Sequence, residues 1–303
     1  AKKLGTKRVI ARIGDEKYLS PENKLLFKDM GMDMMFFPEK SASDEIVDML
    51  RHSASTDSLD FARGKLQLAV FKLDDDSPLL DMNVAEFARA VRAAQEGADF
   101  RIVAISRGGT TLIPTFDSHF KYKDYLYIIS GREGMPALMK YLGKDRQEVR
   151  RVLILGGSEI GEMVATRLAA LKLDDVKIID IDPKRCRQLS EDLPDEVSVA
   201  CGDVRNADFL QEEDIRSYHA ILSVTGNDET NILSCVVAKK LGVPRTIAQV
   251  ENLEYLRLAE DMGVDSVINK KLITASRIFK FTLSDKVRSV RYMSGTDAEV
   301  LEY

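Results

Sequence analysis

The chain has 303 residues, of which 45% are hydrophobic and 31% are charged, and its formal net charge is −5. This balance is typical of a globular chain of two or three domains and excludes a long disordered protein. Basic and acidic residues are mixed along the sequence, so no nucleic-acid partner is expected. No apolar run reaches the roughly 18–20 residues that cross a bilayer, so no membrane insertion of its own is expected.

Residues 1–57 contain two strand–helix units. The run VIARI indicates a strand, and a helical stretch then leads to Asp29, Met30 and Gly31. A further apolar run and an amphipathic helix follow. Two such units cannot bury a parallel strand on both faces. Another chain, an upstream segment or the neighbouring module must therefore cover them, and the sequence leaves these three alternatives open.

Residues 58–147 predict a small α+β module. Gly108 and Gly109 stand between two β-rich runs, where paired glycines favour a hairpin turn. The expected strands are LQLAVFKL, FRIVAISR, TTLIP and YLYIIS, and the expected helices are VAEFARAVRAA and residues 136–142.

Residues 148–285 alternate short β-branched runs with helical stretches such as EMVATRLAALKL. This alternation predicts an α/β domain with a Rossmann-like, doubly wound parallel sheet. The six expected strands are RVLIL, VKIIDI, VSVAC, AILSV, TIAQV and VDSVI. Residues 286–303 resemble the first strand of a second small module.

An internal repeat links the two ends of the chain. The segment AKKLG at residues 1–5 recurs at residues 238–242, and a DMG tripeptide follows each copy after a strand and a helical stretch. Repeated motifs in the same order predict a tandem architecture. Residues 1–57 then correspond to the C-terminal part of a first Rossmann domain that lacks its own glycine turn. Since the chain opens without methionine, we expect a fragment truncated at both ends.

The strand RVLIL runs directly into the sequence GGSEIG and then into a helix. A tight glycine turn at such a junction aims helix N-terminal N–H groups at a pyrophosphate. The glycine frame places Gly156, Ser158 and Gly161 in the three positions, with serine replacing the second glycine. A serine hydroxyl there can donate a hydrogen bond to phosphate. The predicted phosphate turn comprises Gly156, Gly157, Ser158, Glu159, Ile160 and Gly161.

Asp180 ends the second strand, nineteen residues after Gly161. A carboxylate at this distance accepts hydrogen bonds from the adenosine ribose and repels a 2′-phosphate, which disfavours NADP. The alternative is that Asp180 merely ends a strand. Its neighbours Ile181, Asp182 and Arg185 are included in the predicted site.

Two further strand ends are expected to border the same crevice, because ligands bind at the carboxyl ends of parallel strands. One is expected to bring Asp203 to the adenine amino group. In the other, the hydroxyl of Thr225 and the turn amides are expected to reach phosphate or the second ribose. Asp228 belongs either to this site or only to the cap of the next helix. These strand ends contribute Gly202, Asp203, Val204, Thr225, Gly226 and Asn227.

No catalytic or metal-binding arrangement is evident. His219 begins a strand and is expected at the end of the sheet far from the crevice. The cysteines, Cys186, Cys201 and Cys235, show no metal-ligand spacing and are expected to behave as small, reduced hydrophobic residues. Binding without turnover is therefore the favoured interpretation, and no enzyme activity and no metal are expected.

The runs VLILGGSEIG, VKIIDIDPKR, CGDVRN and ILSVTGNDETNILSCVVAKKLG together resemble the nucleotide-binding half of the RCK, or KTN, family of potassium-conductance regulators. The module at residues 58–147 is similar to the C-terminal subdomain of that family. The resemblance covers essentially the whole chain, in tandem repeat. By residue match, the phosphate turn carries over onto Gly156, Ser158 and Gly161, and the ribose carboxylate onto Asp180. The adenine-side aspartate carries over onto Asp203 and the later turn onto Thr225 and Gly226.

The resemblance implies a cytoplasmic, non-enzymatic gating subunit at the cytoplasmic face of the inner membrane. Such proteins form homo-oligomers, as dimers or tetrameric rings, beneath a membrane potassium-translocating subunit of the TrkH type. NAD(H) is the expected ligand, with ATP and ADP as alternatives. Three departures from the family pattern, Ser158, Glu159 and Gln249, disfavour gating by ATP in particular. Gln249 stands where the family usually has an arginine in the fifth strand, and the truncated copy keeps this arginine as Arg12.

Two other functions remain open from the sequence. An NAD-dependent oxidoreductase would use the small α+β module as its substrate domain. A structural ring protein would carry a degenerate site that binds no nucleotide.

Overall fold

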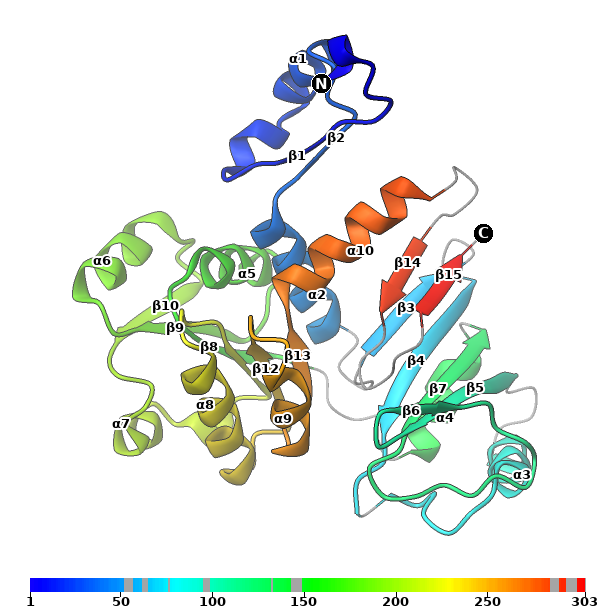
Figure 1. The fold of residues 1–303 in the computed structure, drawn as a ribbon. Coiled ribbons are helices and arrows are strands. Elements are labelled where there is room, and N and C mark those ends of the chain that lie inside the picture. The colour runs from blue at the N-terminus through cyan, green and yellow to red at the C-terminus, as the bar shows by residue number, and fades with distance from the viewer. Residues whose placement is uncertain are drawn as a thin grey trace.

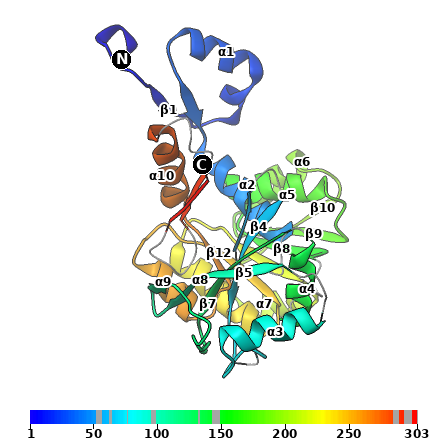
Figure 2. The ribbon, with the colours of Figure 1, turned by 90° about the vertical axis from the view of Figure 1, so that its right-hand side faces the viewer.

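The structure is a computed structural model (Figures 1 and 2). It describes residues 1–51, 57–61, 65–75, 77–94, 99–131, 133–142, 149–283, 289–292 and 299–302.

A six-stranded, wholly parallel sheet forms the centre of the larger domain. Its strand order is β10-β9-β8-β11-β12-β13, so the chain winds outward from β8 in one direction and then returns to continue in the other. This order is that of a doubly wound Rossmann sheet and confirms the predicted fold class. The strands are β8 (Arg151–Leu155), β9 (Asp175–Asp180), β10 (Val197–Cys201), β11 (Ala220–Ser223), β12 (Arg245–Gln249) and β13 (Ser266–Ile268).

Helices cover both faces of this sheet, as buried parallel strands require. The helices α5 and α6 pack on one face, and α7, α8 and α9 pack on the other. The helix bounds are α5 (Glu159–Ala169), α6 (Pro183–Asp192), α7 (Ala207–Glu212), α8 (Asp228–Lys240), α9 (Tyr255–Asp261) and α10 (Lys270–Thr282). In the part of the chain that the structure describes, no helix is both long and apolar enough to span a membrane.

The N-terminal unit contains a two-stranded parallel sheet, and Figure 2 shows it projecting from the rest of the molecule. Several of its apolar side chains, including those of Leu25, Leu26 and Met30, are exposed. The Arg8 guanidinium donates hydrogen bonds to the Phe281 and Leu283 carbonyls, which attaches the unit to the end of α10. The elements are η1 (Lys2–Leu4), β1 (Ile10–Arg12), η2 (Glu16–Leu19), α1 (Pro21–Asp29), β2 (Met34–Phe36) and α2 (Pro38–Arg51).

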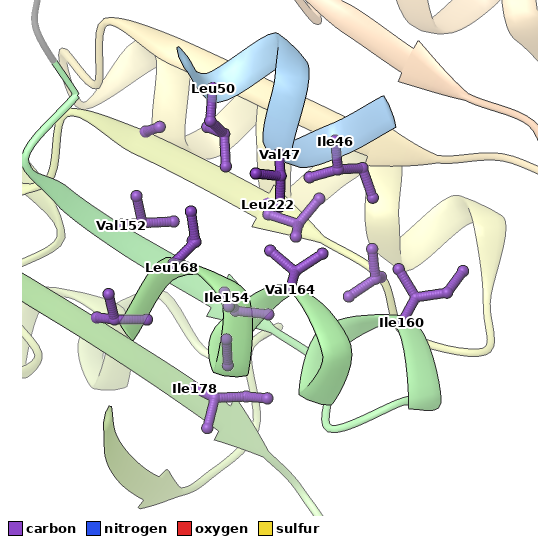
Figure 3. Close-up of a cluster of buried hydrophobic side chains, with 14 of the residues drawn as sticks. Ile46, Val47, Leu50, Val152, Ile154, Ile160, Val164, Leu168, Ile178 and Leu222 are labelled. Carbon is purple, nitrogen blue, oxygen red and sulfur yellow. The ribbon is translucent and has the colours of Figure 1, made fainter. Parts of the chain in front are cut away.

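Helix α2 leaves this unit and docks on the Rossmann domain, between α5 and α10 (Figure 1). Ile46, Val47 and Leu50 are buried in the same core as residues of β8, β11 and α5 (Figure 3). Asp44 pairs with Arg167 of α5 beside this apolar contact. Docking of this helix on the Rossmann domain was not among the three alternatives, which named another chain, an upstream segment and the neighbouring small module. Helix α1 keeps exposed apolar side chains.

The small module has a five-stranded antiparallel sheet in the order β3-β4-β7-β5-β6. Helices α3 and α4 cover one face through a separate apolar core. Gly108 and Gly109 have φ angles of 59° and 80° and form the predicted hairpin turn. The edge strand β3 was not predicted from the sequence. The elements are β3 (Asp57–Phe61), β4 (Leu66–Lys72), α3 (Val84–Ala94), β5 (Phe100–Arg107), β6 (Thr110–Leu112), β7 (Tyr125–Gly131) and α4 (Gly134–Tyr141).

The other face of the small sheet contacts the Rossmann domain. Lys72 Nζ donates to the Glu260 carbonyl oxygen at 3.0 Å and lies 5.6 Å from the centre of the Tyr125 ring. The Arg257 guanidinium lies against Gly109. Helix α9 therefore links the two sheets.

The C-terminal segment differs from its prediction. It contains two antiparallel strands, β14 (Ser289–Tyr292) and β15 (Glu299–Glu302), rather than one. Val300 packs against the apolar side chains of the small sheet. The expectation of a single strand was wrong because residues 286–303 contain a second β-forming run that pairs with the first.

Candidate nucleotide-binding site

The predicted site residues lie at the carboxyl ends of β8, β9, β10 and β11. The first of these ends is the switch point of the sheet, where β8 lies between β9 and β11. Crevices for ligands in doubly wound folds occur at this point.

Two glycines of the turn after β8 have no room for a side chain. Gly156 has a φ of 110°, and a Cβ atom there would lie 2.7 Å from the backbone nitrogen of Thr225. A Cβ atom on Gly161 would lie 2.3 Å from the Gly156 carbonyl oxygen. The first glycine thus permits the strained turn, and the third permits close packing of α5 on that turn.

Ser158 is the N-cap of α5, and its Oγ accepts a hydrogen bond from the Gly161 N–H at 3.3 Å. The serine therefore begins the helix and keeps its own O–H free to donate. Ile160 is buried in the main core, so only its backbone faces the turn. The helix N-terminus supplies N–H groups and a positive dipole end that favour an anion.

The Asp180 carboxylate lies beside the phosphate turn. Its Oδ2 accepts from the Gly157 N–H at 2.6 Å, and its Oδ1 accepts from the Asp182 N–H at 2.8 Å. Asp182 is itself the N-cap of α6. These contacts bring the predicted ribose acceptor and the predicted phosphate turn together, and they orient the carboxylate on the site's edge.

Charges around the turn are mostly paired. Arg185 Nε donates to the Gly157 carbonyl at 2.6 Å, and its guanidinium also contacts the Glu162 carboxylate. Burial raises the pKa of Glu159, and the carboxylates of Glu39 and Glu162 add to this effect. Since Glu162 pairs with Arg185 and Glu39 pairs with Lys270, the carboxylate that opposes an additional terminal phosphate is that of Glu159 at the start of α5.

The strand end after β10 contributes mainly its backbone. The Gly202 N–H donates to the Asp180 carbonyl at 2.9 Å. Asp203 forms an ion pair with Arg205, which holds the pKa of Asp203 at about 2. Val204 is buried in the core on the α7 side, whereas Ile181 is exposed. Asp203 is thus available at the surface but already has a cationic partner.

Asn231 organises the turn after β11, although its place in the sequence did not predict this role. It is fully buried, and its Oδ1 accepts from the Thr225 N–H at 2.9 Å and from the Thr225 hydroxyl at 2.6 Å. Its Nδ2 donates to the carbonyls of Thr225 and Gln249. The sequence feature that could have indicated this role is a polar residue within the apolar run of α8. The Thr225 hydroxyl therefore donates its hydrogen bond to Asn231. Gly226 can contribute only backbone groups to the site.

The cap of α8 is Asn227, whose side chain accepts from the Thr230 N–H at 2.7 Å. The interpretation of Asp228 as this cap was wrong. Its carboxylate instead accepts hydrogen bonds from the N–H groups of Glu251 and Asn252. Asp228 thus joins the turn after β11 to the turn after β12, because it faces the neighbouring strand end.

The remaining titratable candidates lie as expected, with one exception. His219 lies at the opposite end of the sheet, where its Nδ1 accepts from the Arg151 N–H at 3.1 Å. Cys186 and Cys235 are buried, but Cys201 is exposed. The expectation that all three cysteines behave as small hydrophobic residues is not met by Cys201, which is the last residue of β10 and is exposed. Among the described residues, no group of three or more metal-ligating side chains occurs.

The sheet order and the glycine turn define a Rossmann domain of the nucleotide-binding type. Residues 152–270 match the model of the TrkA-N domain family.

Named relatives extend the likeness to nearly the whole chain. The Trk system potassium uptake protein trkA homolog 1 of Methanosarcina mazei is 28% identical over 298 residues, covering 98% of this chain and 71% of the relative. TrkA of Halomonas elongata is 28% identical over 293 residues, covering 97% of this chain and 63% of the relative. The chain therefore spans about two thirds of the length of these relatives.

Two solved structures share the fold. The GsuK RCK domain superimposes with a TM-score of 0.59 at 16% identity, covering 94% of this chain and 65% of that one. The GsuK channel bound to NAD superimposes with a TM-score of 0.56 at 19% identity, covering 90% of this chain and 46% of that one.

Proposed function

We propose that this chain is a cytoplasmic regulatory subunit of a potassium uptake system, located at the cytoplasmic face of the inner membrane. It binds NAD(H) at the carboxyl ends of β8 to β11 and thereby controls a TrkH-like membrane partner that translocates potassium. The observation that carries the proposal is the contact between Asp180 and the Gly157 N–H, which joins a ribose acceptor to a phosphate turn. The names of the relatives supply the potassium transport system.

Charge favours a dinucleotide over ATP. The Glu159 carboxylate begins α5, and Glu39 and Glu162 lie near enough to raise its pKa. A terminal phosphate beside the Glu159 carboxylate adds repulsion, whereas NAD(H) places an uncharged ribose beyond its pyrophosphate. ADP and ATP are the alternative ligands. The solved structure of the GsuK channel bound to NAD supports the choice of a dinucleotide as ligand.

Helix α5 provides a physical route from ligand to partner. Its N-terminus forms the phosphate turn, and its buried face packs against α2 (Figure 3). The pair formed by Arg167 and Asp44 adds a polar contact between the two helices. A ligand that prefers one position of α5 relative to α2 shifts the equilibrium between arrangements of the chain in proportion to its differential affinity. In a homo-oligomeric ring, dimeric or tetrameric, that shift reaches the membrane partner.

Calorimetry with NADH, NAD, ADP and ATP tests the proposal. We expect one nucleotide to bind at the ends of β8 to β11, and we expect NADH to bind more tightly than ATP. Mass spectrometry of nucleotide released from the purified protein identifies the resident ligand. Absence of binding heat with all four nucleotides at millimolar concentration would contradict the proposal and favour a structural ring protein.

Fluorescence of bound NADH separates a sensor from an oxidoreductase. For a sensor, the signal persists when candidate hydroxy, keto or aldehyde compounds are added. Steady oxidation of NADH by any of them would replace this proposal with the enzymatic alternative.

A further inference from the structure

Two of the cysteines lie together behind the ribose end of the candidate site. Cys201 ends β10 and is the register partner of Asp180 at the end of β9. Cys186 lies in the first turns of α6, and its Sγ is 3.3 Å from the Asp180 carbonyl oxygen and 3.7 Å from that of Ala200. The Cys186 thiol therefore contacts the residue that precedes Cys201 and the residue paired with Cys201 across the two strands. The fold therefore brings together two cysteines that are fifteen positions apart in the sequence.

The two thiols differ in their surroundings. Cys186 is buried, with 7% of its surface exposed, and burial raises its pKa. Cys201 is exposed and accessible to a small oxidant. Cys235 is fully buried in the core between α8 and α9, away from this pair. An accessible thiol next to a second cysteine is the arrangement in which the first is oxidised and the second resolves the product.

We propose that Cys186 and Cys201 are an oxidisable pair that closes to an intramolecular disulfide when the chain meets hydrogen peroxide. The Cys201 sulfur attacks the peroxide, the O–O bond breaks, and hydroxide leaves with a proton as water, which gives a sulfenic acid. The Cys186 sulfur then attacks the Cys201 sulfur, the S–O bond breaks, and a second water carries away the Cys186 proton. Two thiols lose two electrons, and one peroxide becomes two waters.

The disulfide changes the support of Asp180. In the reduced protein, the Cys186 thiol and the Gly202 N–H both donate to the Asp180 carbonyl oxygen. Oxidation removes the thiol donor and ties the start of α6 to the end of β10. Asp182, the N-cap of α6, also holds the Asp180 carboxylate through its N–H. We therefore expect oxidation to weaken nucleotide binding, and this second step rests on the function proposed above.

Peptide mapping of the whole chain tests the disulfide itself. Reduced protein is treated with hydrogen peroxide, and free thiols are alkylated before digestion without reductant. The expected product is a peptide that links residues 186 and 201, lost again on addition of dithiothreitol. Cys186→Ser is expected to accumulate a sulfenic acid at Cys201 that dimedone captures. Oxidation of Cys201 only to sulfinic or sulfonic acid in the wild-type chain, or linkage only between chains, would overturn the proposal.

Calorimetry with NADH on the reduced and oxidised chains tests the coupling. We expect the Kd to rise by about fivefold or more on oxidation, since couplings between sites commonly have this size. By reciprocity, bound NADH shifts the equilibrium between the disulfide and the two thiols toward the thiols by the same factor. The matched controls are Cys201→Ser, which should abolish the effect of peroxide, and Cys235→Ser, which should keep it. An unchanged Kd in a chain shown by mapping to carry the disulfide refutes the coupling, whereas failure of both forms to bind refutes the proposed function and leaves the disulfide standing.

Discussion

At single positions of the candidate site, the size of the side chain matters as much as its chemistry. The space around Gly156 and Gly161 explains why these positions are glycine, and the N-cap role of Ser158 explains why serine fits the middle position. The sequence predicted these positions from spacing alone. It missed Asn231, because one asparagine within an apolar helical run has no distinctive spacing and gains its role only when α8 packs beside β12.

Gly161→Ala should destabilise the domain by about 1–3 kcal/mol, because the new methyl group has to displace the Gly156 carbonyl or shift α5. Urea unfolding measures the loss. Gly226→Ala is the matched control, since no atom lies within 4 Å of the Cβ that it adds. Equal stability of the two variants would contradict the packing role assigned to Gly161.

Asp180→Asn should weaken binding of every adenine nucleotide by about 1–3 kcal/mol, because charge-assisted hydrogen bonds from the ribose are lost. Asparagine keeps one oxygen that can accept from the turn, so the fold should persist. Isothermal calorimetry gives the affinity and circular dichroism checks the fold. Asp174→Asn, which changes an exposed carboxylate just before β9, at the far end of the sheet, should bind as the wild type does. Undiminished affinity of Asp180→Asn would remove Asp180 from the site.

At the scale of elements, periodicity predicted most helices and strands, but not the partners of the amphipathic ones. The sequence predicted a helix after the second apolar run, and left three alternatives for what covers it. The structure buries Ile46, Val47 and Leu50 of that helix in the Rossmann core. Strand β3 escaped prediction because it is short, carries two aspartates and is held as an edge strand by pairing with β4.

Ile46→Ala should cost about 2–5 kcal/mol, because it leaves a cavity in the contact between α2 and α5. Leu26→Ala, on the exposed side of α1, should change stability by no more than about 0.5 kcal/mol. Chemical denaturation of both variants makes the comparison. Similar small losses would mean that α2 does not dock on α5 in solution.

At the scale of the whole molecule, α9 joins the Rossmann domain to the small sheet, where Glu260 is partly buried. Burial raises the pKa of Glu260, and Asp261 opposes its charge further, whereas Lys72 and Arg257 lower the pKa. The folded chain therefore keeps the proton to higher pH than the unfolded chain does. The stabilising effect of the protonated form is full below the ordinary value of 4.5 and is lost as pH rises through the raised pKa.

Glu260→Gln should accordingly raise the Tm at neutral pH, and the difference from wild type should shrink as pH falls toward 4.5. Differential scanning fluorimetry across this range measures both. Glu254→Gln, at the exposed start of α9, is the control and should show no such trend. A difference in Tm that stays constant over the whole range would show that ionisation of Glu260 does not affect the contact.

The sequence by itself determined the doubly wound sheet, the position of its glycine turn and the acidic residue at the end of β9. These features are local, since strand period, glycine spacing and helix start are encoded within a few neighbouring residues. Only the tertiary structure decided that α2 packs on α5, that Asn231 holds the turn after β11 and that Cys186 lies beside the end of β10. Each of these contacts depends on which surfaces the packed elements bring together. Residues that are distant in the sequence show no local pattern that predicts such a contact.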